Sequence, residues 1–369
     1  MVTKTDSLLT RRTFMKGVGA VGAIALAPTV FAQSSRTVSF TLPWMAQGAT
    51  AFLYVAQDQG MFKKRGINVE IARGFGSLAA GQAVANKQFD FGMVSTSSTL
   101  LCRANGLTLK GLATTNYEAY LGILVRADSP IKRPEDLLNK RLGGVPSSVE
   151  FPLWAAFAQR TGVDASKVEI VQADPRILER TLVEGQIDAA FCVASSSYAV
   201  AQGMGVDTRA MLLQDHGMSF YSNNIVTTEA MFAAEPNLCR DVTDAVLEGL
   251  AFTANDPEAA MGILLKKVPE LALSKGGKEN VRLSQGFMLA SLPTPESKLN
   301  GLGFTDLKRI DEMTDLIMQY AAPKSAQRPV ADQLFTNEFV GTQHLSDAQW
   351  TAVQQYANEF PKLLKGESV

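Results

Sequence analysis

From Val38 onward, short runs rich in β-branched and aromatic residues alternate with amphipathic or alanine-rich stretches. The short runs are typical of strands, and the longer stretches are typical of helices. A chain in which strands and helices alternate builds sheets whose strands are largely parallel. We therefore predict an α/β fold. The expected strands are Val38–Leu42, Ile67–Arg73, Phe89–Ser95, Leu109–Thr114, Leu121–Arg126, Arg141–Val145, Val168–Gln172, Ile187–Val193, Arg209–Leu213 and Asn224–Thr227.

Helices are expected between most of these strands and throughout the C-terminal third. After Asn237 the strand signals fade, and Pro and Gly mark the breaks between helical stretches. The expected helices include Phe52–Lys64, Leu78–Lys87, Phe151–Arg160, Ile177–Glu184, Arg240–Asn255, Glu258–Lys267, Thr305–Tyr320 and Asp347–Phe360.

A faint internal repeat has an offset of 98 residues. It relates Gln88–Gly92 to Gln186–Ala190, and both segments continue into serine-rich turns. Any two βαβ units share turn chemistry, so a chance match is the alternative. We favour two lobes built on one plan. Ligands of α/β sheets bind where strands end and helices begin, and two such lobes would face each other across a cleft.

The N-terminus has the parts of an export signal. The run Thr10–Lys16 (TRRTFMK) precedes the uncharged segment Gly17–Ala32, which ends in small residues suited to cleavage. TRRTFMK resembles the twin-arginine signal, which directs export of folded proteins. An uncleaved membrane anchor is the alternative, but the apolar segment is shorter than the roughly 20 residues that span a bilayer. We expect residues 1–32 to be a signal peptide and the protein to be periplasmic.

Composition excludes several classes of function. The chain has 35 Lys+Arg and 36 Asp+Glu, for a net charge of −1, so no basic surplus favours nucleic acid. Two histidines without ligand-like spacing and three scattered cysteines favour neither a metal site nor a disulfide framework. We expect no metal and no cofactor.

Several segments resemble the periplasmic solute-binding proteins of ABC importers. They are TLPWMAQGATAFLYVAQDQGMFKKRGINVEIARGFGSLAAGQAVANKQFDFGMVSTSS, PEDLLNKRLGGV, VEGQIDAAF, LLQDHGMSFYSNNIVTTEAM and VADQLFTNEFV. The subgroup that they resemble contains the sulfonate, nitrate and taurine binders and the binders of thiamine-pyrimidine precursors. Two departures concern the ligand: Met45-Ala46-Gln47 follows Trp44 where many relatives have Pro-Asn, and the CCCFC-type motif of eukaryotic pyrimidine synthases is absent.

The resemblance implies a two-lobed periplasmic binding protein fold (type II), with two chain crossovers and a helical C-terminal region. Residues 36–126 would form the first part of lobe one and residues 127–223 lobe two, and residues 224–369 would return to lobe one. The crossovers would then lie near Arg126–Ala127 and Asn223–Asn224. In such proteins hinge bending closes the lobes on a small molecule. The closed monomer then docks on a membrane permease driven by a separate ATPase.

Candidate ligand-binding residues lie at the ends of expected strands. Trp44 would stack on a flat ligand, and the turn at Gly76 and Ser77 would allow close backbone approach. Hydroxyl and amide groups would supply further hydrogen bonds, and acids would accept from amino groups. For each residue an ordinary core, capping or surface role is the alternative. The remaining candidates are Ser95, Thr96, Asn116, Glu118, Ser147, Ser148, Asp174, Asp215 and Tyr221, the last as a second aromatic face.

The leading function is capture of a small organic solute for import, without catalytic residues. The acids Glu118, Asp174 and Asp215 favour an amino-substituted heterocycle such as a pyrimidine-type thiamine precursor. A sulfonate, taurine or nitrate binder of the same fold is one alternative. An enzyme of the pyrimidine-synthase type and a periplasmic sensor are two others.

Overall fold

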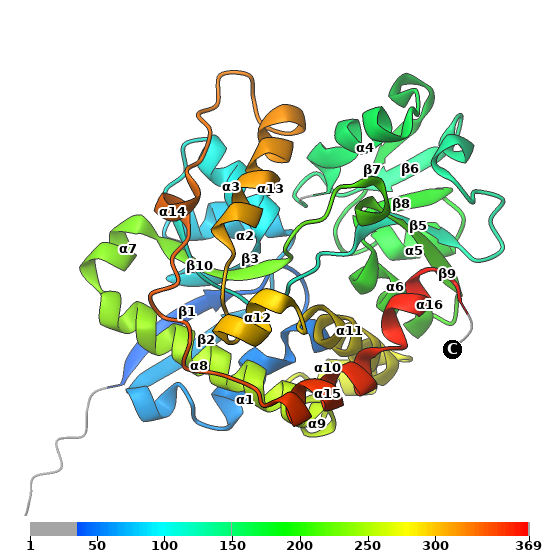
Figure 1. Cartoon of the computed structure of the whole chain (residues 1–369). Coiled ribbons are helices and arrows are strands. Elements are labelled where there is room, and N and C mark those ends of the chain that lie inside the picture. Colours follow the sequence, from blue (N-terminus) through cyan, green and yellow to red (C-terminus); the bar gives the residue numbers. More distant parts are fainter. Residues whose placement is uncertain (1–34, 149, 368–369) are drawn as a thin grey trace, which may run out of the picture. The chain divides into compact units, whose positions relative to one another are not determined.

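Two five-stranded sheets organise residues 35–148 and 150–367, the part of the chain that the computed structural model describes (Figure 1). The expected signal peptide, residues 1–32, lies outside these residues. The strand order is β2-β1-β3-β10-β4 in the first sheet and β7-β6-β8-β5-β9 in the second. The first sheet contains β1 (Arg36–Thr41), β2 (Ile67–Ala72), β3 (Phe91–Ser95), β4 (Leu109–Thr114) and β10 (Asn223–Thr228). The second contains β5 (Leu121–Arg126), β6 (Arg141–Gly144), β7 (Glu169–Gln172), β8 (Ala189–Val193) and β9 (Thr208–Leu212).

The two sheets follow one plan. In each sheet, the fourth strand in this order is antiparallel to both of its neighbours. This strand is β10 in the first sheet and β5 in the second. The other pairings are parallel. The predicted strands are all present, and the prediction of largely parallel sheets is correct apart from this one antiparallel strand in each sheet.

The repeat seen in the sequence extends to individual hydrogen bonds. The Oδ2 atom of Asp90 accepts from the backbone N–H of Ser39 at 2.8 Å, next to β3 and β1. Ninety-eight residues later, Oδ2 of Asp188 accepts from the backbone N–H of Arg141, also at 2.8 Å, next to β8 and β6. The shared Gln-x-Asp sequence therefore fixes the same strand pair in both halves.

The chain changes sheet twice. It passes from the first sheet to the second between β4 and β5, at residues 115–120, and returns between β9 and β10, at residues 213–222. The first crossover was expected at Arg126–Ala127, after β5. Because β5 pairs with β8 and β9 in the second sheet, this change of sheet precedes β5. The expected second crossover, Asn223–Asn224, is the start of β10. The exact boundaries of the lobes stay a prediction.

Helices flank both sheets and dominate the C-terminal part. None of the described helices is long and apolar enough to cross a membrane. The helices that follow strands are α1 (Ala51–Asp58), α2 (Ser77–Ala85), α3 (Thr96–Ala104), α4 (Trp154–Thr161), α5 (Leu178–Val183), α6 (Ala194–Gly203) and α7 (Glu229–Ala234). The C-terminal helices are α8 (Pro236–Asn255), α9 (Pro257–Lys267), α10 (Pro269–Leu273), α11 (Gly277–Ser291), α12 (Pro295–Asn300), α13 (Leu307–Tyr320), α14 (Ala331–Leu334), α15 (Asp347–Ala357) and α16 (Phe360–Leu364).

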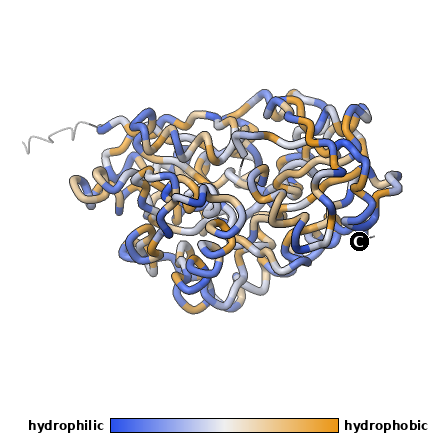
Figure 2. Tube along the Cα trace, turned by 90° about the horizontal axis from the view of Figure 1, so that it is seen from above, coloured by the Kyte–Doolittle hydropathy of each residue, from blue (hydrophilic) through white to orange (hydrophobic). Residues whose placement is uncertain are grey.

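Helix α11 was not among the named expected helices, because it lies in a stretch whose glycines and prolines were interpreted as a break between two helices. The structure explains the second glycine of this helix. A Cβ atom on Gly286 would lie 2.2 Å from the ring of Phe360. The ring of Phe360 therefore packs directly against the helix backbone, where only glycine fits. Figure 2 shows hydrophobic and hydrophilic residues interspersed along the described part of the chain. Packing on several sides therefore adds to the stability of α11.

Candidate ligand-binding site

A cavity lies where segments of the two sheets meet. On the side of the first sheet it is lined by the loop after β1, the starts of α2 and α3, and α11. On the side of the second sheet it is lined by the loop after β6, α5 and the β8–α6 junction. Both chain crossings also contribute. The lining residues are Pro43, Trp44, Met45, Gln47, Ala49, Thr50, Ser77, Ser95, Ser97, Asn116, Glu118, Ala119, Tyr120, Leu121, Ser148, Glu150, Leu178, Glu179, Cys192, Val193, Ser195, Ser196, Ser197, Ser222, Asn223, Ser284, Phe287 and Met288.

The ends of parallel strands position this lining, as the sequence predicted. Strand β3 ends at Ser95. The Oγ atom of Ser95 accepts a hydrogen bond of 3.2 Å from the backbone N–H of Ser98 and so caps the start of α3. Strand β8 ends at Val193 and continues directly into α6. Both helices therefore begin at the cavity, where their backbone N–H groups are free of intrahelical partners.

Six of the predicted site residues line the cavity together. They come from the first sheet, from the first crossing and from the loop after β6, so the structure unites residues more than 100 positions apart. They are Trp44, Ser77, Ser95, Asn116, Glu118 and Ser148.

Three further predicted residues lie beside the cavity. Ser147 donates its hydroxyl to the carbonyl oxygen of Phe75 at 2.7 Å, which joins the loop after β6 to the loop before α2. Gly76, in that second loop, packs against Ser147. Thr96 is buried, and its backbone N–H donates to the carbonyl oxygen of Ser222 at 2.7 Å. These residues hold the walls of the cavity together.

The structure does not bring Asp174, Asp215 or Tyr221 to the cavity. Asp174 binds Arg176 at 2.9 Å, and this hydrogen bond lowers the pKa of its carboxyl to about 2. Asp215 lies 3.4 Å from Lys365. Tyr221 is fully buried in the interior, because both its ring and its hydroxyl find partners there.

Tyr120 and Phe287 supply the further aromatic surface that the sequence analysis assigned to Tyr221. Their ring centroids are 6.1 Å apart, and both side chains line the cavity with Trp44. Phe287 was missed because α11 was missed. The serine run Ser195–Ser197 had a signal, since the 98-residue offset carries Ser97 onto Ser195. Glu150 and Glu179 had no signal that distinguishes them from surface acids.

The lining contains three carboxyl groups and, among the described residues, no Lys, Arg or His. Glu150 is 3% exposed, and burial raises the pKa of its carboxyl to about 8. Burial also raises the pKa of Glu179, although Ser197 donates to its Oε1 atom at 2.7 Å. Desolvation penalises each charged carboxylate unless a cation or several donors compensate. The electrostatics of the cavity therefore oppose an additional negative charge.

Four polar atoms of the lining have no hydrogen-bond partner among the described residues. They are Nε1 of Trp44, Nε2 of Gln47, Oγ of Ser97 and Oε2 of Glu150. A buried polar group without a partner costs roughly 1–3 kcal/mol, so these atoms are suited to a bound solute. The set contains donors and acceptors, and it fits a ligand that carries both.

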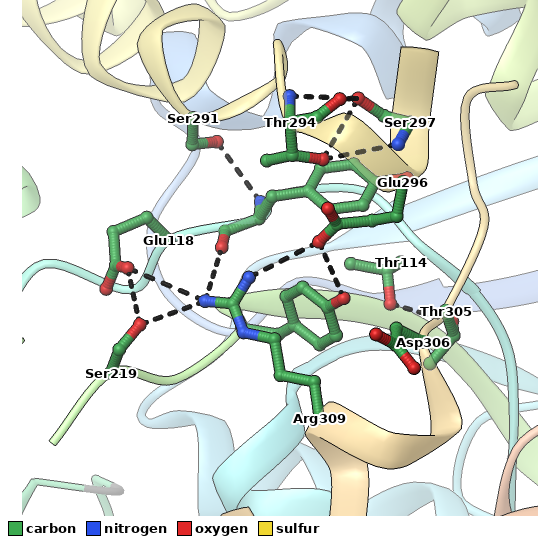
Figure 3. A network of polar contacts seen from close by, with 12 residues as sticks. Thr114, Glu118, Ser219, Ser291, Thr294, Glu296, Ser297, Thr305, Asp306 and Arg309 are labelled. Atoms are coloured by element: carbon green, nitrogen blue, oxygen red, sulfur yellow. Dashed lines mark hydrogen bonds and ion pairs between the residues drawn. The ribbon is translucent and has the colours of Figure 1, made fainter. Parts of the chain in front are cut away.

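Glu118 connects the cavity to a polar network behind it (Figure 3). Burial raises the pKa of its carboxyl, while Ser219 and Arg309 oppose that rise. Ser219 donates to Oε2 of Glu118 at 2.8 Å, and the backbone N–H of Ala119 donates to Oε1 at 3.0 Å. The guanidinium of Arg309 lies 3.7 Å from the same carboxylate.

Arg309, from α13, contacts both crossings between the sheets. It donates to the carbonyl oxygen of Tyr117 at 3.2 Å on the first crossing and to Oγ of Ser219 at 2.9 Å on the second. Its guanidinium also lies 4.0 Å from the ring centroid of Tyr221 and 3.4 Å from Glu296 (Figure 3). The side chain of Arg309 thus links the two crossings, which would act as the hinge if the two sheets moved relative to each other.

Two similar sheets, two crossings and a cavity between them define the periplasmic binding protein fold. The chain matches the family model described as NMT1/THI5 like over residues 47–260, and it belongs to this family. Among solved structures, it resembles the alkanesulfonate-binding protein SsuA from Xanthomonas axonopodis pv. citri bound to MOPS. That match has a TM-score of 0.63 and 14% identity, and covers 81% of this chain and 98% of that one. The nitrate-binding protein NrtA from Synechocystis PCC 6803 gives a TM-score of 0.61 at 12% identity, covering 90% of this chain and 91% of that one.

Curated relatives include binding proteins and synthases. The riboflavin-binding protein RibY of Chloroflexus aurantiacus is 26% identical over 321 residues, covering 85% of this chain and 89% of that protein. The formylaminopyrimidine-binding protein of Halalkalibacterium halodurans is 22% identical, covering 64% and 72%. The 4-amino-5-hydroxymethyl-2-methylpyrimidine phosphate synthase THI13 of Saccharomyces cerevisiae is 20% identical, covering 64% and 73%.

Proposed function

We propose that this protein is the extracytoplasmic solute-binding component of an ABC importer. It captures a flat, nitrogen-containing solute between its two sheets and delivers it to a membrane permease that works with a separate ATPase. The observation that carries the proposal is the cavity itself. It lies between the sheets, is lined by Trp44, Tyr120 and Phe287, and offers hydrogen-bonding atoms that have no partner among the described residues.

The charge of the lining supports a neutral or cationic heterocycle over an oxyanion. The helix starts at the cavity would favour an anion by about 0.3–1 kcal/mol each. Repulsion between an anion and an ionised carboxylate about 5 Å away is about 3 kcal/mol at an effective dielectric constant of about 20. Glu150 is mostly protonated at neutral pH and exerts no such repulsion, but repulsion from any lining carboxylate that is ionised outweighs the helix contribution, and the described lining holds no cation that would attract an anion. A pyrimidine-type thiamine precursor or a similar heterocycle is therefore the preferred ligand class.

Similarity to named proteins supports the same class. The names of two curated relatives specify riboflavin and formylaminopyrimidine, both nitrogen heterocycles. Export by the twin-arginine route to the periplasm completes the proposal. Its support is the TRRTFMK run and the likeness to periplasmic binding proteins.

An enzyme of the pyrimidine-synthase type is the second candidate, because curated relatives of this chain include proteins named as such synthases. Product analysis separates the two functions. A binding protein returns its solute unchanged after incubation and denaturation, whereas an enzyme returns a converted compound.

A thermal-shift screen of the purified protein tests the ligand class. The panel contains aminopyrimidines, riboflavin, taurine, an alkanesulfonate and nitrate. We expect the midpoint of unfolding to rise with a heterocycle, since a ligand that binds only the folded state stabilises it. A rise with taurine or the alkanesulfonate and none with any heterocycle would reverse the assignment.

A further inference from the structure

Glu150 has an unusual position for a carboxyl group. It follows the loop after β6 and lines the cavity, yet its side chain is buried and its Oε2 atom has no partner among the described residues. No Lys, Arg or His of the described lining is available to neutralise it. A buried carboxylate without a cation is costly, so this side chain requires either a proton or a positive charge from elsewhere.

Glu179 is a second acid in the same wall. It lies in the first turn of α5, is 5% exposed, and is held in place by the hydroxyl of Ser197 at 2.7 Å. Burial is the main cause of the raised pKa of Glu150, repulsion from Glu179 adds to it, and both residues line the same cavity. They project from different elements of the second half into one cavity.

We propose that Glu150 and Glu179 form a subsite for a cationic, planar nitrogen group of the solute, of the amidine type. The proposal rests on the proposed binding function and deepens it. An amidinium carries two parallel N–H donors that match the two oxygens of a carboxylate. Its single positive charge offsets one ionised carboxylate of the pair, and the other acid can stay neutral. Trp44, Tyr120 and Phe287 line the same cavity and favour a flat cation over a polar anion.

The subsite makes binding release a proton. Before binding, Glu150 is mostly protonated at neutral pH, because burial keeps the pKa of its carboxyl near 8. When the cation arrives, the O–H bond of that carboxyl breaks, the proton passes to the buffer, and the carboxylate keeps the electron pair. The other titratable groups of the lining are Glu118, Glu179, Tyr120 and Cys192. Burial raises the pKa of Tyr120 and of Cys192, so both stay neutral, while Arg309 already faces Glu118.

Benzamidine and benzamide test the subsite as a matched pair. The two molecules have nearly the same shape, but only benzamidine is a cation at pH 7. We expect the purified protein to bind benzamidinium at least about tenfold more tightly than benzamide in isothermal titration calorimetry. Phosphate and Tris take up a proton with different enthalpies. Binding enthalpies measured at pH 7 in the two buffers should therefore differ by an amount that corresponds to the release of up to about one proton.

Three variants assign the effect to residues. Glu150→Gln and Glu179→Gln keep the size of the side chain and remove its charge, and each should weaken benzamidinium binding at least about tenfold while leaving benzamide within about twofold. Unchanged benzamide binding shows that each variant is folded. Glu169→Gln, on the exposed face of β7, is the control and should change neither affinity.

Equal affinity for the two probes in the wild-type protein would overturn the subsite. So would the absence of benzamidinium binding at 50 mM, or a preference for benzamidinium that survives in both Glu150→Gln and Glu179→Gln. A preference for benzamide would also contradict it, because Glu150 would then act as a neutral donor. If neutral heterocycles still bind the wild-type protein in these cases, the proposed function stands and the cation subsite alone is wrong.

Discussion

Gly76 and Ser147 meet where the two halves of the protein touch. A Cβ atom on Gly76 would lie 2.3 Å from the carbonyl oxygen of Ser147, closer than any real contact of that kind. The same oxygen accepts from the backbone N–H of Ala79 at 3.3 Å, and the Ser147 hydroxyl donates to Phe75. This small contact joins a loop of the first sheet to a loop of the second beside the cavity.

Gly76→Ala should weaken ligand binding at least about tenfold, because the added methyl group separates the two loops and disfavours closure. The backbone φ of +123° adds strain of roughly 1–3 kcal/mol to an alanine at this position. Gly60→Ala is the control, since Gly60 also has a positive φ but no atom lies within 4 Å of its Cβ position. Calorimetry and small-angle scattering check both variants. Equal affinities of the two variants would show that this contact is not part of closure.

Trp44→Ala should lower the affinity for a stacked heterocycle by about 1–3 kcal/mol, if stacking resembles that of nucleic-acid bases on aromatic side chains. Trp44→Phe separates two contributions, because it keeps an aromatic face but lacks the indole N–H, which has no partner among the residues that the structure describes. We expect an intermediate affinity for this variant. A dissociation constant unchanged by Trp44→Ala would remove the residue from the binding site.

Arg309→Met should destabilise the fold by about 2–4 kcal/mol, because it leaves Glu118 and Glu296 without their cation. The double variant Arg309→Met, Glu118→Gln should recover part of this loss, since the uncompensated acid at the cavity is then neutral. Urea unfolding of the two single variants and the double variant gives the coupling free energy. A coupling of zero would show that the two side chains act independently.

From the raised pKa of Glu150 we predict that the contribution of this residue to the stability of the folded protein falls as pH rises. The pKa of Glu150 is about 8 in the folded state, above its ordinary value of 4.5, so the unfolded chain loses this proton first as pH rises. The ligand-free wild-type protein should therefore lose a few kcal/mol of unfolding free energy relative to Glu150→Gln between pH 5 and about 8. Urea unfolding across this range measures the difference. A difference that is constant or grows in the other direction would contradict the burial of this acid.

Much of the fold was predictable because its signals are local. The strands are short, strongly β-forming runs, and the repeated Gln-x-Asp segments at Asp90 and Asp188 make the same capping hydrogen bond in each half. The first crossover was misplaced because β5 is as apolar as the strands of the first sheet. Only its pairing with β8 and β9 assigns it to the second sheet.

The site was harder to predict, because it depends on which strand ends converge. Trp44, Ser77 and Glu118 stand at such ends, and all three line the cavity. Phe287 lies on α11, whose glycines suggested a break between helices, and the packing of this helix against Gly48 and Phe360 has no local signal in the sequence. Asp174 carries the signal of a site residue, but Arg176 lies two positions away and binds its carboxylate.

The measurement that tests the central claim most directly is calorimetric titration of the purified protein with heterocycles and oxyanions, followed by chemical analysis of the recovered solute. The account predicts a nitrogen heterocycle bound with a dissociation constant of about 1 μM or below, about −8 kcal/mol, and returned intact. Tight binding of a sulfonate or nitrate with no heterocycle bound, or recovery of a converted product, would contradict it.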